Sequence, residues 1–128
     1  MDQPHHPDFS LRRVLGMDIE AVESGHAVTR LRISDTHLNP NGAVHGGVLF
    51  TMIDTAMGMA TMTVLEEGRC ASIEIHLRFL RPASSGLLEA HATVIRQGRR
   101  VVHLESRVHD DAGSLVATGT GTFAVISA

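Results

Sequence analysis

The chain has 128 residues, a formal net charge of −3 and a pI near 6.3, a size that suits one domain with a substantial hydrophobic core. The acidic balance argues against a nucleic-acid-binding protein, because such proteins usually present a basic face. A single cysteine forms no internal disulfide, and no stretch reaches the ~18 consecutive apolar residues of a membrane-spanning helix. We therefore expect a cytoplasmic protein without nucleic-acid or membrane partners.

The first predicted element is a short helix behind an N-terminal tail. Residues 1–9 are acidic and broken by proline, and they lack the apolar core of a secretory signal. We expect them to form a flexible tail ahead of a single domain at residues 10–128. Ser10 is a candidate N-cap for the helix, and Gly16 is expected to end it.

Two strands and a loop are predicted next. Residues 17–24 and 26–33 have strand patterns and are joined by a Ser-Gly turn. In the second strand one face is predicted to be buried and the other water-exposed, because two sets of residues alternate. The first set is Ala27, Thr29, Leu31 and Ile33, and the second is Val28, Arg30 and Arg32. Residues 35–42 are rich in turn formers, which predicts a loop.

One long helix is predicted from Gly46 to about Glu66, where apolar residues recur at helical spacing and methionines extend the apolar surface almost around the helix. Asp54 is the one charged residue in the middle of this segment, and an ionised carboxylate is costly to bury without partners. Two interpretations remain open at this point. Asp54 is either a structural carboxylate bonded to Thr51 or Thr55, or a residue retained for chemistry.

Four further strands are predicted over residues 70–80, 86–97, 99–110 and 114–126. The connections between them are short enough for antiparallel neighbours. Two strands, one long helix and four strands together predict an α+β fold. We expect a curved antiparallel sheet of about six strands wrapped around one long central helix.

Three segments carry a resemblance to a known family: GAVHGGVLFTMID at residues 42–54, FLRPAS at 79–84 and GRRVV at 98–102. In this order they resemble the hotdog-fold acyl-CoA thioesterases, and within them the PaaI-like, phenylacetate-pathway branch. The likeness extends over nearly the whole chain from about Ser10. It implies hydrolysis of an acyl-CoA to free CoA and a carboxylic acid, without a cofactor or a metal. It also implies a homodimer with active sites between subunits, and a homotetramer of two such dimers.

The resemblance also implies roles for individual residues. Asp54 takes the position of the catalytic carboxylate, as nucleophile or as general base, and the Gly46 N–H that of the oxyanion donor. Asn39 and His45 match groups that orient the thioester and the donor loop, and Ser72 matches a hydroxyl beside the carboxylate. The implied coenzyme A contacts are Gly47, Phe79, Leu80, Arg81, Pro82, Ala83, Ser84, Gly98, Arg99 and Arg100.

Elementary chemistry is consistent with these roles. The N–H groups in the first turn of a helix have no helical partner and lie at the positive end of its dipole, where they can stabilise an oxyanion. Asp54 follows Gly46 by eight residues, which is roughly 12 Å along a helix. One thioester carbon cannot contact both within one subunit, so this hypothesis requires two subunits that share each site. Burial between apolar neighbours should raise the basicity of Asp54.

Each of these residues also has a structural interpretation. The glycines after His45 can provide a tight entry into a packed helix, His45 can cap that helix, and Asn39 can stabilise a turn. Ser72 can be an ordinary edge hydroxyl, the arginines can be solvated, and Cys70 is expected to be a plain buried cysteine. The scattered histidines have no metal-ligand spacing.

Two other functions remain open: a hotdog-fold enoyl-CoA hydratase or dehydratase, and a non-catalytic acyl-CoA-binding module. The pattern also leaves open the acyl group, aryl or aliphatic, and the choice between a dimer and a tetramer.

Overall fold

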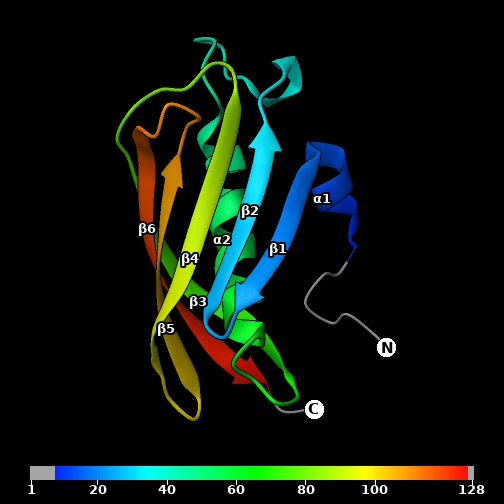
Figure 1. Ribbon diagram of the computed structural model, residues 1–128, viewed down its shortest axis with the longest axis vertical. Helices are drawn as coiled ribbons and strands as arrows, with labels where there is room; N and C mark the ends of the chain where they lie inside the picture. Colours follow the sequence, from blue (N-terminus) through cyan, green and yellow to red (C-terminus); the bar gives the residue numbers. More distant parts are fainter. Residues whose placement is uncertain (1–7, 127–128) are drawn as a thin grey trace.

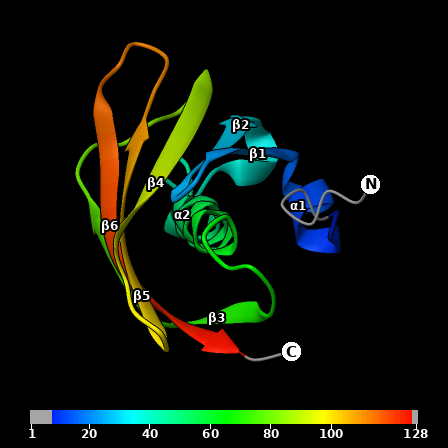
Figure 2. The ribbon, with the colours of Figure 1, turned by 60° about the horizontal axis from the view of Figure 1, so that its bottom comes forward.

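A computed structural model describes residues 8–126, except for the side chains of residues 21–22, and it has one six-stranded antiparallel sheet that curves around one long helix (Figures 1 and 2). The strand order is β1-β2-β4-β5-β6-β3, and the helix contacts all six strands. This confirms the predicted α+β architecture. The elements are α1 (Ser10–Leu15), β1 (Met17–Glu23), β2 (His26–Arg32), the 3-10 turn η1 (Asp35–His37), α2 (Gly46–Met62), β3 (Arg69–Phe79), β4 (Leu87–Gln97), β5 (Val101–His109) and β6 (Leu115–Ile126).

The inner face of the sheet is shaped to receive α2. Strand β5 alternates buried and exposed residues along its length, so one face is apolar and the other is wet. On β6, a side chain at Gly121 would place its Cβ 2.6 Å from the Met57 sulfur, and one at Gly119 would place it 3.1 Å from Ile53. These two glycines therefore allow the helix to lie close against the sheet, where Met57 and Ile53 are fully buried.

Both helices differ from the prediction at one end. Helix α2 ends at Met62 rather than Glu66, because the Thr63 hydroxyl donates to the Ala60 carbonyl and accepts the N–H of Gly25. These bonds fasten the chain to the β1–β2 hairpin as the helix ends. Helix α1 is capped by Phe9 and not by Ser10, since Phe9 has the extended backbone of a cap and packs against the core. Residues 1–7 of the predicted tail lie outside the described residues.

The connection after β3 is short enough for an antiparallel neighbour, but β3 and β4 do not pair. Strand β3 pairs with β6 and lies at the edge of the sheet, while β4 pairs with β2 and β5. The connection at residues 80–86 therefore crosses from one side of the curved sheet to the other. Its backbone bonds to Val116 of β6, to Ile33 after β2 and to Val44, whose N–H donates to the Ala83 carbonyl at 2.8 Å. The crossing thus lies against the loop that leads into α2.

His37 joins α1 to that same loop and had no recognisable signal in the sequence. Its side chain is 4% exposed, its Nδ1 accepts the Ser34 N–H at 2.9 Å, and its Nε2 donates to the Leu15 carbonyl at 2.8 Å. Its own carbonyl accepts the N–H of His45. Within residues 8–126, no helix is long and apolar enough to cross a membrane.

Candidate active site

Asp54 lies in an open groove of about 680 Å³ between α1, α2, β3 and the end of β6. In Figure 2, α1 lies on the side of α2 that faces away from β5 and β6. The groove walls are largely apolar. Three of the four phenylalanines of the chain contribute to them, together with two methionines of α2. These residues are Phe9, Phe50, Phe123, Met59 and Met62.

The Asp54 carboxylate is half-buried and unpaired. Among residues 8–126 it has no hydrogen bond or ion pair, and the Thr51 hydroxyl donates instead to the Gly47 carbonyl at 2.9 Å. Burial raises the pKa of Asp54 above the ordinary value of 3.8, as expected from its apolar neighbours. The geometry therefore gives no support to a structural carboxylate held by Thr51 or Thr55. An unpaired carboxylate of raised basicity is suited to accept a proton.

The first four residues of β3, Arg69 to Ser72, line another wall of this groove, and two of them carry reactive groups. Ser72 lines it with an exposed side chain, and its role beside the carboxylate stays a prediction. Cys70 also lines it and is half-buried rather than fully buried, with its sulfur 3.8 Å from the Gly58 carbonyl oxygen. Burial, and secondarily the charge of Asp54, raises the pKa of the Cys70 thiol. Cys70 is thus kept in the weakly nucleophilic thiol form.

The first turn of α2 leaves one N–H available. His45 caps the helix: its Nδ1 accepts the Gly47 N–H at 2.8 Å, and its carbonyl accepts the N–H groups of Val48 and Leu49. The Gly46 N–H has no hydrogen-bond partner in the described part of the chain. Gly46, and not Gly47, can therefore donate to a bound carbonyl oxygen.

Asn39 shapes the loop ahead of this turn. Its side-chain oxygen accepts the N–H groups of Asn41 and Ala43 at 2.9 and 3.1 Å, and its backbone N–H donates to the Ala43 carbonyl. These bonds fit the turn-forming interpretation. They also fix the path of the chain into the donor turn, so Asn39 can orient the Gly46 N–H without contacting a substrate.

The two predicted coenzyme A segments lie at opposite ends of the sheet. Phe79–Ser84 is beside the donor turn, where the Phe79 ring would lie 3.1 Å from a Cβ at Gly46. The turn with Gly98, Arg99 and Arg100 is elsewhere, since the Arg100 carbonyl accepts the Val125 N–H while Phe79 pairs with Ala117. Eight residues of β6 separate these two points, or roughly 27 Å. A single chain therefore does not bring both segments to one ligand.

The predicted catalytic residues are divided in the same way. Asp54 and Ser72 line the groove, whereas Gly46, His45 and Asn39 lie at the N-terminal end of α2, outside the groove lining. Eight residues of helix put Gly46 and Asp54 roughly 12 Å apart along its axis. Within one chain, the predicted catalytic residues therefore form two separate groups.

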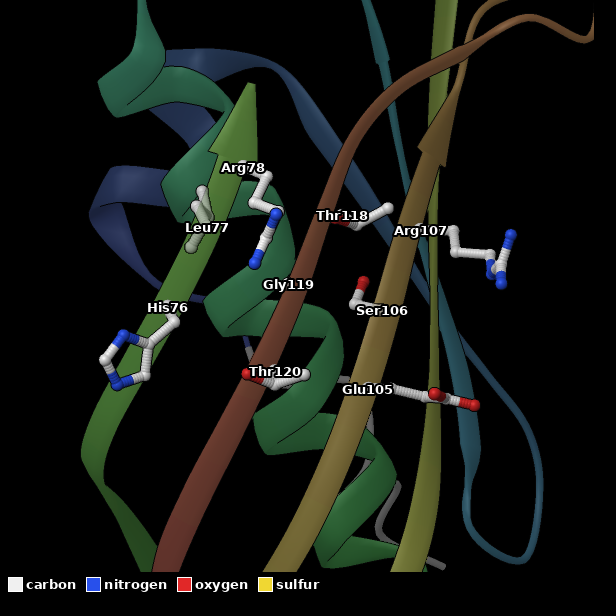
Figure 3. Close-up of a pocket in the computed structure, with 9 residues that line it drawn as sticks. All are labelled: His76, Leu77, Arg78, Glu105, Ser106, Arg107, Thr118, Gly119 and Thr120. Atoms are coloured by element: carbon white, nitrogen blue, oxygen red, sulfur yellow. The ribbon is translucent and has the colours of Figure 1, made fainter. Parts of the chain in front are cut away.

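A second hollow of about 490 Å³ lies among β3, β5 and β6 and contains none of the predicted site residues. Its charged side chains do not converge: in Figure 3, His76 and Arg107 point to opposite sides of the view. The described residues include no group of three His, Cys, Asp or Glu side chains that could hold a metal ion.

Some groove residues were not found by sequence reasoning. Leu11 reaches the groove from α1, Phe9 from the cap of that helix, and Phe123 from β6. No spacing in the sequence signals these contacts, because the three residues come together only through the curvature of the sheet and the position of α1.

Comparisons with known proteins agree with the fold. The thioesterase superfamily matches residues 41–117. The 1,4-dihydroxy-2-naphthoyl-CoA hydrolase of Listeria monocytogenes is 28% identical over 118 residues, covering 91% of this chain and 96% of that protein. The structure of E. coli PaaI, from the phenylacetic acid degradation operon, superposes with a TM-score of 0.88 and 26% identity, covering 94% and 86% of the two chains. A phenylacetic acid degradation-related protein of Ralstonia eutropha gives a TM-score of 0.85 and 38% identity, covering 93% and 92%.

Proposed function

The chain belongs to the thioesterase superfamily and is a thioester hydrolase, and from this premise we propose that it hydrolyses acyl-CoA esters with Asp54 as the catalytic carboxylate. The observation that carries the proposal is the unpaired, half-buried Asp54 in an apolar groove. The Listeria relative is named for a coenzyme A thioester, which supports this class of substrate.

In the proposed reaction, Asp54 accepts a proton and the Gly46 N–H stabilises the oxyanion. Asp54 accepts a proton from a water molecule, the water oxygen attacks the thioester carbon, and the carbonyl oxygen becomes negatively charged beside the Gly46 N–H. Collapse of this intermediate breaks the C–S bond, and CoA leaves as a thiolate that takes up a proton. In the other route Asp54 itself attacks the carbon, the C–S bond breaks and CoA leaves as a thiolate that takes up a proton, and water then hydrolyses the resulting anhydride to the carboxylic acid and free Asp54. Ser72 lies on the groove wall where it can orient the attacking water.

The proposal requires two subunits. Gly46 of one chain faces Asp54 of its partner if two α2 helices pack antiparallel about a two-fold axis, which creates two equivalent sites. The same arrangement lets Phe79–Ser84 of one chain and Gly98–Arg100 of the other hold one coenzyme A. We propose a homodimer as the active unit, a tetramer of two such dimers as its assembly, and the cytoplasm as its compartment, which suits a protein with one free cysteine.

A thiol-release assay tests the proposed substrate class. Wild-type protein is incubated with aryl, hydroxyaryl and short-to-long aliphatic acyl-CoA esters, and free CoA is followed with a chromogenic thiol reagent. A reaction without substrate corrects for Cys70. The proposal expects enzyme-dependent CoA release from at least one ester. A folded, dimeric protein that releases CoA from none of them, or that hydrates an enoyl-CoA without releasing CoA, would contradict it.

The pH dependence of kcat/KM tests the ionisation state of Asp54. The base must be ionised, so the rate falls as pH is lowered through its pKa, and burial moves that pKa above the ordinary 3.8. We therefore expect an acid limb at a higher pH than an exposed aspartate would give. Circular dichroism at each pH verifies that the protein stays folded. A flat profile down to the ordinary aspartate pKa would contradict the assignment.

A further inference from the structure

Helix α1 is held to the domain by Phe9 and Leu15, which pack against the core at its two ends, and by two side-chain hydrogen bonds. Arg12 donates to the Met17 carbonyl at 2.7 Å, and His37 donates to the Leu15 carbonyl at 2.8 Å. None of the six residues of α1 is buried. The helix therefore lies on the outside of the domain, with Leu15 packed against the core and the other side chains partly or fully exposed.

One side of helix α1 faces the groove. Leu11, which is 50% exposed, lines the groove together with Phe9, whereas Val14 is 76% exposed and does not line it. An apolar side chain left half-exposed gains free energy from any apolar surface that covers it. Leu11 and Phe9 thus give the groove an outer apolar face that has no cover within residues 8–126.

The position of Asp54 in the same groove indicates which group covers Leu11 and Phe9. A thioester carbon that reacts with Asp54, or with a water held by it, must lie within a few ångströms of the carboxylate, about 3–3.5 Å for direct attack. The acyl group attached to that carbon then occupies the same groove, between the residues of α2 and α1 that line it. The alternative occupant is a surface of the partner subunit.

On the basis of the proposed function, we propose that α1 forms the outer wall of the acyl site and that Leu11 and Phe9 determine which acyl groups are accepted. The occupant is the apolar acyl group of the substrate. Removing the Leu11 side chain widens the site and favours a bulkier or longer acyl group. Enlarging it narrows the site and favours a smaller one.

The test compares kcat/KM across a series of acyl-CoA esters for wild type, Leu11→Ala, Leu11→Trp and Phe9→Ala. Val14→Ala is the matched control, because it shortens an apolar residue of the same helix that does not line the groove. We expect the ratio of kcat/KM for long and short esters to rise about tenfold in Leu11→Ala and to fall about tenfold in Leu11→Trp. Phe9→Ala should shift the ratio in the same direction as Leu11→Ala, and Val14→Ala should leave it unchanged.

Three outcomes would overturn the inference while leaving the proposed function intact. In the first, wild type is active and the Leu11 variants keep its substrate profile. In the second, Val14→Ala shifts the profile as much as Leu11→Ala does. In the third, the Leu11 variants change the oligomeric mass in size-exclusion chromatography but not the profile, which assigns the surface to the partner subunit. A wild type that is inactive on every ester overturns the proposed function itself, and this inference with it.

Discussion

Replacement of Asp54 by asparagine is expected to lower kcat by about a hundredfold to ten-thousandfold, because asparagine keeps the shape of the side chain but cannot accept the proton. A still larger loss is expected if the carboxylate is the nucleophile. The measurement is CoA release from the best ester of the series, at substrate concentrations well above KM. Glu105→Gln provides a control, since it neutralises an exposed carboxylate outside the groove.

The same variant is expected to be at least as stable as the wild type. Burial raises the pKa of Asp54 in the folded state, so the folded protein holds more protons than the unfolded chain between the two pKa values. The free energy of unfolding therefore falls as pH rises through this window and stays lower above it. Asparagine carries no charge, so the variant avoids this fall in the free energy of unfolding. Urea unfolding at neutral pH measures the free energy of unfolding of the two proteins. If the Asp54→Asn protein is folded and keeps wild-type turnover, the catalytic assignment of Asp54 is contradicted.

Replacement of Gly46 by proline is expected to lower kcat by about a hundredfold to a thousandfold, the usual cost of losing one oxyanion donor. Proline is well tolerated at the first position of a helix, and Gly46 is the first residue of α2. The preceding His45 already has the extended backbone that proline requires, with ψ of 138°. The substitution thus removes one N–H that has no partner within residues 8–126 and leaves the helix intact.

Gly46→Ala is the matched control for this variant. Both substitutions add a Cβ, which would lie 3.1 Å from the end of the Phe79 ring and displace it slightly. Alanine keeps the N–H and proline does not. A loss of activity in the proline variant alone assigns the effect to the donor, whereas equal losses in the two variants would assign it to the displaced Phe79.

Periodicity was enough to predict most of the fold. The residues that repeat along α2 are buried, because the helix packs against a common core. Strand β2 alternates only from Thr29 to Arg32, since Val28, which the pattern placed on the water-exposed face, is buried as well. The place of β3 could not be predicted. A short connection permits an antiparallel neighbour but does not require one, and residues 80–86 follow the end of the curved sheet instead.

The candidate site was predicted less completely than the fold. Gly46 and Asp54 stand in a recognisable segment, and their separation along one helix already indicated a site shared between subunits. The cap made by His45 and the bonds of Asn39 are local, and sequence reasoning anticipated both. Leu11 could not be found in this way, because it reaches the groove only through the placement of α1 against the domain.

The shared site is the central claim, and mixing two inactive variants tests it most directly. Gly46→Pro and Asp54→Asn chains carrying different affinity tags are unfolded together, refolded in equal amounts, and assayed for CoA release. In a hybrid dimer, one site combines the intact Gly46 of one chain with the intact Asp54 of the other, so random pairing should restore about a quarter of wild-type activity. Hybrid dimers recovered through both tags that are no more active than the separate variants would show that the two residues do not act across the interface.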